Sequence, residues 1–454
     1  MYKNKILLII IPLFYIGCAN LEVEQKSFDL NNVSIYKNIN NEKSSFIEYK
    51  NFINDENLLK YIEIALNNNR NYKKSIYNLE MVKSNYKIQK SNEYPNIDLG
   101  LSGSKSKANN NITQNSSTTI GISNYEIDLY GKYKDLTEVE FENYLSNENN
   151  LKSYKISLIS QIISSWVNIN YYKKMIYTCN NIETNSLESL NITKKRFELG
   201  IDDISSIYNS EIIYNQSKVD SIIYKTKLKQ EIKNFELLIG ENIKEDFILK
   251  SNYIELNKIV NNFNYEIKSD ILLNRPDVLE AEHQLKSVQA NIEAVRKTYF
   301  PTISLTSSYG LSSNLLSGLF THGTSVVWNF IPSISMNLFD FEEKDSKLNY
   351  QISKRDYYIS NYEYVVQNAF KEINNELIRK NTIIEQKNYQ NKLLTSSYNS
   401  YEYYNVRYKN GVENFINVLN SQRTYYSSLK NLISLELEET ENTINLYKVF
   451  GGSI

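Results

Sequence analysis

The motif Arg196-Phe197-Glu198-Leu199-Gly200-Ile201 decides the fold, because the chain repeats it as Arg407-Tyr408-Lys409-Asn410-Gly411-Val412. From position 196 to position 407 the shift is 211 residues. Three further matches follow in the same order at nearly the same offset: Leu238-Ile239-Gly240 with Val449-Phe450-Gly451, Tyr94-Pro95-Asn96-Ile97-Asp98-Leu99 with Phe300-Pro301-Thr302-Ile303-Ser304-Leu305, and Ile127-Asp128-Leu129-Tyr130 with Met336-Asn337-Leu338-Phe339. Four ordered matches predict an internal two-fold repeat, and therefore one pseudo-symmetric unit in place of two unrelated domains.

Residues that break helices are rare, with 13 Gly and 5 Pro among 454 residues, which is low for a globular protein. Neither type occurs in 132–196 or in 342–407. Each of these ranges would span about 97 Å as a helix, at a rise of about 1.5 Å per residue. Shorter runs predict return helices at 56–92, 202–239, 272–299 and 412–449, with Pro276 opening the third of them. Each half of the chain thus reads as one long helix beside two stacked shorter helices.

The range 202–239 carries a narrow apolar seam of the kind found in coiled coils. Its members are Ile204, Ile207, Ile212, Val219, Ile223, Leu228, Ile232, Phe235 and Leu238. This seam predicts the face on which the return helix packs.

Two strand pairs are predicted between the helices, within 97–129 and 300–339, each around a polar loop at 103–117 or 310–325. Apolar residues alternate with polar residues along the strands, so the two faces meet different environments. A soluble sheet or a membrane barrel would explain this pattern. Four strands cannot close a barrel, and open edges do not occur in lipid. In a membrane, several chains must therefore share one barrel, and three chains would supply twelve strands.

The amino-terminal residues 1–17 have the pattern of a signal peptide: Lys3 and Lys5 precede an apolar run that is too short to span a bilayer. This run ends at Gly17-Cys18, which resembles a bacterial lipobox. The resemblance implies that Cys18 becomes a lipidated mature N-terminus, and Ala19 after it favours the outer membrane. The alternative is an ordinary signal peptide with an incidental Cys18.

Several stretches resemble the TolC-like outer-membrane efflux proteins, in particular the OprM/NodT-type lipoproteins. These stretches are Tyr125-Glu126-Ile127-Asp128-Leu129-Tyr130-Gly131-Lys132, Arg275-Pro276-Asp277-Val278-Leu279-Glu280-Ala281-Glu282, Phe300-Pro301-Thr302-Ile303-Ser304-Leu305, Leu316-Ser317-Gly318-Leu319-Phe320 and Leu446-Tyr447-Lys448-Val449-Phe450-Gly451-Gly452. The resemblance implies a mixed α/β membrane protein. It would be a homotrimer with a long antiparallel α-helical coiled-coil barrel, plus a β-barrel to which each protomer gives four strands.

The expected organisation follows from the repeat and the resemblance together. Its parts are a signal peptide (1–17), a lipidated and equatorial segment (18–55), a first repeat (56–239, with a helical hairpin at 132–239), an equatorial linker (240–271) and a second repeat (272–454, with a helical hairpin at 342–450). The expected location is the outer membrane, anchored through Cys18, with the helical tunnel spanning the periplasm.

The resemblance also implies a gate at the periplasmic tip, where Gly200 and Gly411 form the turns after the long helices. Family members place apolar and acidic rings just beyond the tip, and these positions map to Phe415, Ile416, Asn417, Asn420 and Arg423. Asn417 and Asn420 stand where many relatives carry Asp, which argues against an anionic ring unless Glu413 replaces it. Tyr408 matches a tyrosine that relatives use in a hydrogen bond between gate helices. For every one of these residues, plain coiled-coil packing is the alternative.

Enzyme motifs are absent from the sequence: there is no phosphate-binding loop G-x-x-x-x-G-K-[ST] and no G-x-S-x-G. Glu280 and His283 form a single Glu-x-x-His, whereas a helical di-metal site needs two such motifs. Glu126 and Asp128 pair beside a strand-to-helix junction, which favours a structural or pore-lining role. We expect no cofactor and no metal, and the net charge of −1 argues against a nucleic-acid partner.

The expected function is that of the outer-membrane channel in a tripartite efflux pump. It would passively conduct drugs or other small molecules from a periplasmic membrane-fusion adaptor and an inner-membrane transporter of RND or ABC type to the exterior. Three alternatives stay open: an exit duct for type I protein secretion, an exit duct for metal ions, and a non-conducting coiled-coil lipoprotein that braces the envelope.

Overall fold

The structure, a computed structural model, describes residues 49–108, 111–243, 249, 251–261, 274–320 and 325–452. The predicted signal peptide, the lipidation site Cys18 and His322 lie outside the described residues, as does half of the predicted linker 240–271. No helix in the described ranges combines the length and the apolar character that crossing a membrane requires.

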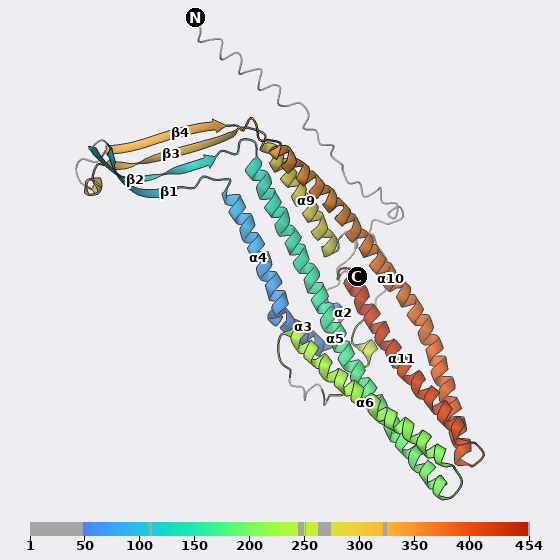
Figure 1. The fold of residues 1–454 in the computed structure, drawn as a ribbon. Helices are drawn as coiled ribbons and strands as arrows, with labels where there is room; N and C mark the ends of the chain where they lie inside the picture. Colours follow the sequence, from blue (N-terminus) through green and yellow to red (C-terminus); the bar gives the residue numbers. More distant parts are fainter. Residues whose placement is uncertain are drawn as a thin grey trace. The chain divides into compact units, whose positions relative to one another are not determined.

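Long helices dominate the fold (Figure 1). The helical elements are α2 (Tyr49–Phe52), α3 (Glu56–Asn68), α4 (Arg70–Ser91), α5 (Lys132–Glu198), α6 (Ile204–Ile239), η3 (Leu256–Lys258), α9 (Pro276–Lys297), η4 (Leu316–Phe320), α10 (Glu343–Lys409) and α11 (Phe415–Val449). Helices α5 and α10 both have 67 residues, and α4 and α9 both have 22. The two 67-residue helices cover the predicted range 132–196 and, apart from Glu342, the predicted range 342–407.

The sequence predicts one uninterrupted helix over 56–92, and this prediction is wrong, because Asn69 separates α3 from α4. The backbone of Asn69 is extended, with ψ 122°. Its side-chain oxygen accepts a 2.8 Å hydrogen bond from the Tyr72 amide, and its amide group donates to the Leu238 carbonyl at 2.8 Å. Asn69 thus caps α4 and ties it to the end of α6, which a local helix pattern does not reveal.

The four strands form one antiparallel sheet in the order β1 (Asp98–Ala108), β2 (Asn111–Glu126), β3 (Thr302–Ser313) and β4 (Ser325–Ser335). The predicted loops at 103–117 and 310–325 are wrong, since β1 pairs with β2 as far as Ala108↔Asn111 and β3 continues to Ser313. Polar side chains there pair across the strands, as in the 2.7 Å contacts Ser102–Ser117 and Ser106–Thr113. Hydroxyl pairs support a strand as apolar pairs do, so polarity alone does not indicate a loop.

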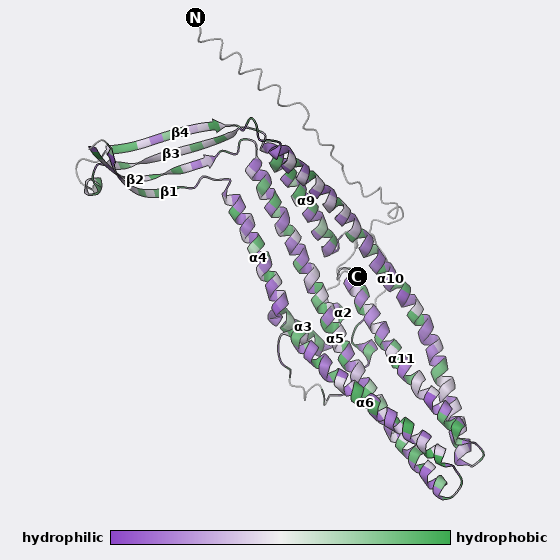
Figure 2. Ribbon diagram, in the orientation of Figure 1, coloured by the Kyte–Doolittle hydropathy of each residue, from purple (hydrophilic) through white to green (hydrophobic). Residues whose placement is uncertain are grey.

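Strands β1 and β4 are the two edges of this sheet, and nearly all of their residues are exposed. Apolar and polar residues are mixed along both strands (Figure 2). Leu99, Leu101, Trp328 and Phe330 are among the exposed large apolar side chains. Each edge therefore offers unpaired backbone groups together with apolar side chains, a combination that an isolated soluble sheet avoids.

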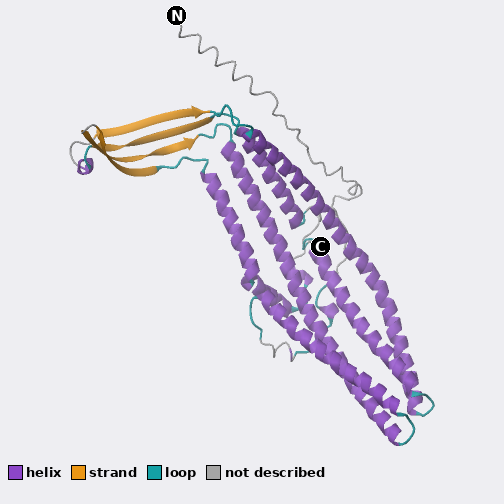
Figure 3. Ribbon diagram, viewed as in Figure 1, coloured by secondary structure: helices purple, strands orange, loops and turns teal. Residues whose placement is uncertain are grey.

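Helix α5 lies among other helices, whereas α10 lies at an edge. The main helix contacts of α5 are with α3, α4, α6, α9 and α11, and those of α10 are with α9 and α11 (Figure 3). As a result α5 buries 23 side chains and α10 only 9, although their lengths are equal.

The largest apolar core gathers where α2, α3, α5 and α6 meet. Its fully buried members include Phe52, Leu58, Ile62, Ile162, Ile163, Ile232 and Phe235. The rings of Trp166 and Phe235 lie 5.5 Å apart in this core. This core joins the segment that precedes α4 to the first helical hairpin.

The seam predicted for α6 is only half right. Leu228, Ile232 and Phe235 are buried as expected, but Ile204, Ile212, Val219 and Ile223 are exposed. The buried positions in that half are Ser210, Ser217 and Ser221 together with Ile213. Ser210 and Ser221 face polar groups of α5, with Ser210 Oγ 3.3 Å from Thr193 Oγ1 and Ser221 Oγ 3.0 Å from Asn180 Oδ1. Small side chains let two helices approach closely, so apolarity does not mark this interface.

Candidate gate at the helix tips

The two long helices end in turns of the same design. Gly200 and Gly411 have φ values of +70° and +76°, a left-handed conformation that favours glycine at a helix end. Each turn is closed by an ion pair between an arginine and an acid six residues later: Arg196 Nε lies 3.1 Å from Asp202 Oδ2, and Arg407 Nε lies 3.3 Å from Glu413 Oε2. The turns therefore hold their shape by local contacts.

One side chain joins the two hairpins at this level. The Tyr408 hydroxyl, on α10, donates a hydrogen bond to the Asp202 carboxylate in the α5–α6 turn. The Arg196 guanidinium lies over the Tyr408 ring, 4.3 Å from its centroid, and Arg196 Nη1 donates to the Tyr408 carbonyl at 3.4 Å. Burial and the hydrogen bond to Asp202 both raise the pKa of Tyr408, so the hydroxyl keeps its proton and acts as the donor.

The two apolar residues predicted for the gate face different environments. Phe415 is 2 % exposed and packs against Tyr408, with ring centroids 5.0 Å apart. It belongs to a cluster with Ile182, Ile213, Tyr408, Val418, Leu419 and Tyr426. Ile416 is 45 % exposed. In this conformation Phe415 is thus an internal packing residue, and Ile416 is available at the surface.

Three of the predicted gate residues share one exposed face of α11. Ile416, Asn420 and Arg423 are exposed and follow each other at steps of four and three residues, so they share one helix face. Asn417 is also exposed, and its amide donates to Glu413 Oε1 at 2.9 Å. Glu413 itself pairs with Arg407, so it is engaged in the turn.

The sequence does not single out Asp202 or Arg196 as site residues, although the structure brings both to Tyr408. Arg196 is visible only as part of the repeated motif. One sequence feature could have identified them: in both copies of the motif, the arginine (Arg196 or Arg407) is followed six residues later by an acidic residue. The contact between Asp202 and Tyr408 spans two hairpins, and no local pattern contains it.

The other residues considered for chemistry form structural contacts. His283 Nδ1 lies 2.5 Å from Glu142 Oε2 between α9 and α5, while Glu280 accepts from the Asn150 amide. Glu126 pairs with Lys132, and Asp128 accepts from the Lys134 amide at the start of α5. In the described part of the chain, no group of three or more His, Cys, Asp or Glu side chains could hold a metal ion.

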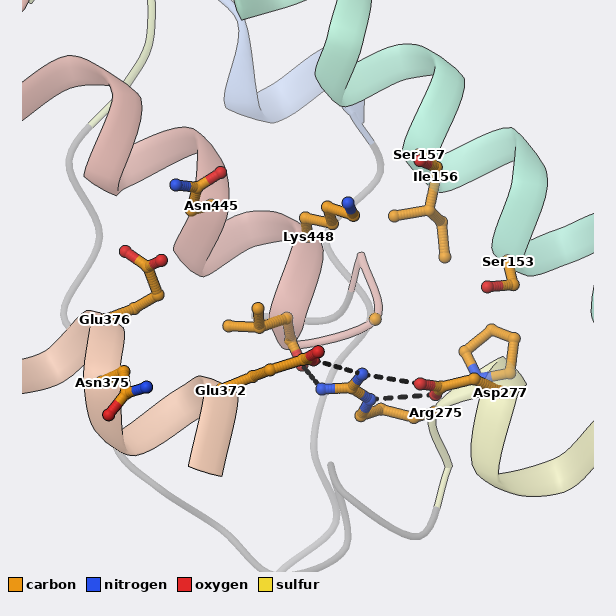
Figure 4. Close-up of a pocket in the computed structure, with 13 residues that line it drawn as sticks. Ser153, Ile156, Ser157, Arg275, Asp277, Glu372, Asn375, Glu376, Asn445 and Lys448 are labelled. Atoms are coloured by element: carbon orange, nitrogen blue, oxygen red, sulfur yellow. Dashed lines mark hydrogen bonds and ion pairs between the residues drawn. The ribbon is translucent and has the colours of Figure 1, made fainter. Parts of the chain in front are cut away.

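Arg275, the first residue of the family-like stretch 275–282, ties the start of α9 to two other helices. Its guanidinium binds Asp277 at 2.7 Å, Glu372 of α10 at 3.0 Å and the Val449 carbonyl at the end of α11 at 2.8 Å (Figure 4). These contacts hold the start of α9 between two other helices. Pro276 occupies the first turn of α9, where a missing amide proton costs nothing.

Comparison with known proteins places these features in one family. The sequence model of the family described as "Outer membrane efflux protein" matches residues 61–241 and 267–452. The solvent efflux pump outer membrane protein SrpC of Pseudomonas putida is 29 % identical over 410 residues, which cover 89 % of this chain and 87 % of SrpC. The probable outer membrane lipoprotein SilC of Salmonella typhimurium is 26 % identical over 470 residues, which cover 100 % of this chain and 99 % of SilC.

A solved structure supports the same conclusion. The MtrE outer membrane channel of Neisseria gonorrhoeae, described in its open state, superposes with a TM-score of 0.83 at 26 % identity. The match covers 91 % of this chain and 94 % of MtrE. The family model alone spans most of the described residues. The chain therefore belongs to the outer membrane efflux proteins and is an outer-membrane component of an efflux system.

Proposed function

We propose that this protein is a passive exit duct, closed at rest by the contact between Tyr408 and Asp202. It receives small molecules from a periplasmic adaptor and an inner-membrane transporter of RND or ABC type and conducts them to the exterior. It performs no catalysis, and the energy for transport comes from its partners. Relatives are named for the efflux of solvents, toluene and antibiotics, which supports small, largely apolar compounds as the substrate class.

The working form is a homotrimer built from a two-fold internal repeat. The equal lengths of α5 and α10, and of α4 and α9, support the repeat. The open edges β1 and β4 support a barrel shared by several chains, because backbone groups in lipid must be paired. Lipidation of Cys18 anchors the trimer, and mass spectrometry of the mature N-terminal peptide tests this step: an unmodified Cys18 would remove the anchor.

The observation that carries the gate is the hydrogen bond from the Tyr408 hydroxyl to the Asp202 carboxylate. It links the α10–α11 hairpin to the α5–α6 turn, and Arg196 forms an ion pair with the same carboxylate. Ile416, Asn420 and Arg423 line the pore at this level, while Phe415 supports the tip from inside. Opening separates the two hairpins, so it must break this bond.

Single-channel conductance in planar bilayers tests the proposal by comparing the wild type with Tyr408→Phe. A hydrogen bond to a charged group contributes about 1.5–3 kcal/mol. The variant should therefore raise the open probability by about tenfold or more, from small and rare openings in the wild type. Tyr403→Phe is the matched control, because Tyr403 lies on the same helix and is exposed.

Two results would contradict parts of the proposal. Inserted protein that conducts in neither form would exclude a duct and favour a non-conducting envelope protein. A wild type that is already wide open would keep the duct but remove the Tyr408–Asp202 gate.

A further inference from the structure

Each half of the chain joins its two return helices through one side chain. In the first half, the Asn69 amide group donates to the Leu238 carbonyl at 2.8 Å. In the second half, the Arg275 guanidinium donates to the Val449 carbonyl at 2.8 Å. Arg275 follows Asn69 by 206 positions, as α9 follows α4, and Val449 follows Leu238 by 211, the shift of the repeated motif. The two contacts are therefore counterparts, made by a short side chain in one half and by a long one in the other.

A cavity with a volume of about 480 Å³ lies at the Arg275 contact. Its walls come from α5, the start of α9, α10 and the end of α11 (Figure 4). Pockets that hold small molecules have volumes of about 300–1,000 Å³. The cavity is thus large enough for a small organic ligand.

The lining of this cavity is rich in charge, and the matching positions in the first half are not. The charged lining residues are Arg275, Asp277, Glu372, Glu376 and Lys448. Their counterparts, by the same two offsets, are Asn69, Asn71, Gln161, Ser165 and Leu237. Because the first half joins its return helices with neutral residues at all of these positions, the join itself does not require a charged lining.

Three of the five charges contact one another. The Arg275 guanidinium lies 2.7 Å from Asp277 and 3.0 Å from Glu372. These contacts hold the start of α9 against α10, so the three groups are engaged in the fold of the second half. Glu376 and Lys448 remain, and the join uses neither of them.

Glu376 and Lys448 have opposite charges and stand on different walls of the cavity. Glu376 belongs to α10, and its Oε2 atom accepts a 2.6 Å hydrogen bond from the Asn442 amide group. Lys448 belongs to the last turn of α11, is exposed, and makes no ion pair in the part of the chain that the structure describes. Its side chain extends toward Ser157 of α5 in Figure 4. The cavity therefore offers one negative and one positive group, on separate walls, to a ligand.

The rest of the polar lining is neutral. It consists of Ser153, Ser157, Asn375 and Asn445. An asparagine side chain and a serine hydroxyl can each donate and accept hydrogen bonds. A peptide group has one donor and one acceptor, so these side chains suit it on both counts. The lining thus matches a molecule that has an ammonium group, a carboxylate and at least one amide.

We propose that this cavity binds a short peptide with free ends. The terminal ammonium of the peptide pairs with Glu376, its terminal carboxylate pairs with Lys448, and its amide groups bond to Asn375 and Asn445. The neutral lining favours a peptide over a single amino acid, which has no amide. This site is separate from the duct and from its gate, so the peptide site and the proposed function can each fail alone.

Isothermal titration calorimetry of the full-length protein in detergent tests the site, with trialanine as the probe. The wild type should bind one trialanine per chain and saturate. Trialanine with an acetylated N-terminus, or with an amidated C-terminus, should bind about tenfold more weakly, because each change removes one charged partner. Absence of saturable binding by trialanine, or equal binding of all three peptides, would overturn the proposal.

Two variants test which charge binds which end of the peptide. Lys448→Met should bind trialanine about tenfold more weakly and should no longer discriminate against the amidated peptide, while it still discriminates against the acetylated one. Glu376→Gln should show the opposite pattern, and the amide oxygen of the new side chain can still accept from Asn442. Crossed losses of this kind identify the groups that meet. Variants that both discriminate as the wild type does would exclude these two residues as the partners.

Two further variants separate the cavity from the general charge of the surface. Lys371→Met removes the same charge from an exposed position of α10 outside the lining, so it should bind trialanine as the wild type does. A loss equal to that of Lys448→Met would show attraction to the whole surface and no site. Asn445→Trp fills the cavity from an exposed position and should abolish binding. Undiminished binding by this variant would place the peptide elsewhere.

Discussion

The α5–α6 and α10–α11 hairpins have nearly the same length but different interiors. The first is packed near its tip with Ser210, Ser217 and Ser221. The second carries a cluster of tyrosines, in which the rings of Tyr401 and Tyr425 stack 5.9 Å apart. Helix length depends on the absence of Pro and Gly, which both halves share, whereas the packing between helices can be achieved by small or by aromatic side chains. The two hairpins therefore have one architecture and two kinds of interface.

The largest effect is expected from Phe415→Ala in the aromatic hairpin. Phe415 is buried against Tyr408, so its removal should destabilise the tip by about 3–5 kcal/mol. Hydrogen exchange of the α10–α11 tip measures this change. Ile416→Ala is the control and should change stability by only about 0.5 kcal/mol, because Ile416 is exposed. Equal effects of the two changes would contradict the placement of Phe415 inside the protomer.

A smaller effect is expected from Ser217→Leu in the serine-packed hairpin. Ser217 is buried, and a larger side chain there should force α5 and α6 apart at a cost of about 1–3 kcal/mol. The loss should appear as faster hydrogen exchange in both helices near this position. Val219→Leu, two residues away and exposed, adds bulk without this cost. If Ser217→Leu stabilised the hairpin, the close approach of its helices would be disproved.

The smallest effect is expected at the helix caps, which also differ between the hairpins. Asp203 accepts hydrogen bonds from the Ser205 and Ser206 amides, whereas the side chain of Asn414 makes no cap bond. Asp203→Ala should speed the exchange of the first amides of α6 severalfold, and Asn414→Ala should leave those of α11 unchanged. Equal changes in both helices would remove the difference between the turns.

Lowering the pH tests the Asp203 cap in a second way. The hydroxyl of Ser205, then the amide of Ser206, lower the pKa of Asp203. A carboxyl whose pKa is depressed on folding stabilises the folded state above its usual range, and this contribution is lost as pH falls through the lowered pKa. The cap should therefore be unchanged from about pH 7 to about pH 5 and be lost only in stronger acid.

The sequence predicts the long helices well, because missing Pro and Gly are a direct signal. It predicts the strand lengths poorly, because the outer parts of β1 and β2 carry Ser, Thr, Asn and Lys, which usually indicate loops. The pairing that continues these strands lies in the backbone and in hydroxyl contacts. No single-residue propensity contains that information.

Contacts between distant segments are the second limit on prediction from the sequence. Asp202 meets Tyr408 across 206 positions, and Asn69 meets Leu238 across 169. The burial of Phe415 depends on Ile182 and Ile213 of the other hairpin. The repeat indicates which helices correspond, but it does not indicate which side chains of two different hairpins meet.

The contacts of Arg275 limit the order in which parts of the chain can join. One of its three acceptors, the Val449 carbonyl, lies 174 positions further along, so this bond cannot form before that part of the chain has been made. The acceptor is a main-chain atom, and no change of side chain at position 449 removes it. A chain that lacks its last residues can therefore place α9 on α5, but it cannot join the start of α9 to the end of α11.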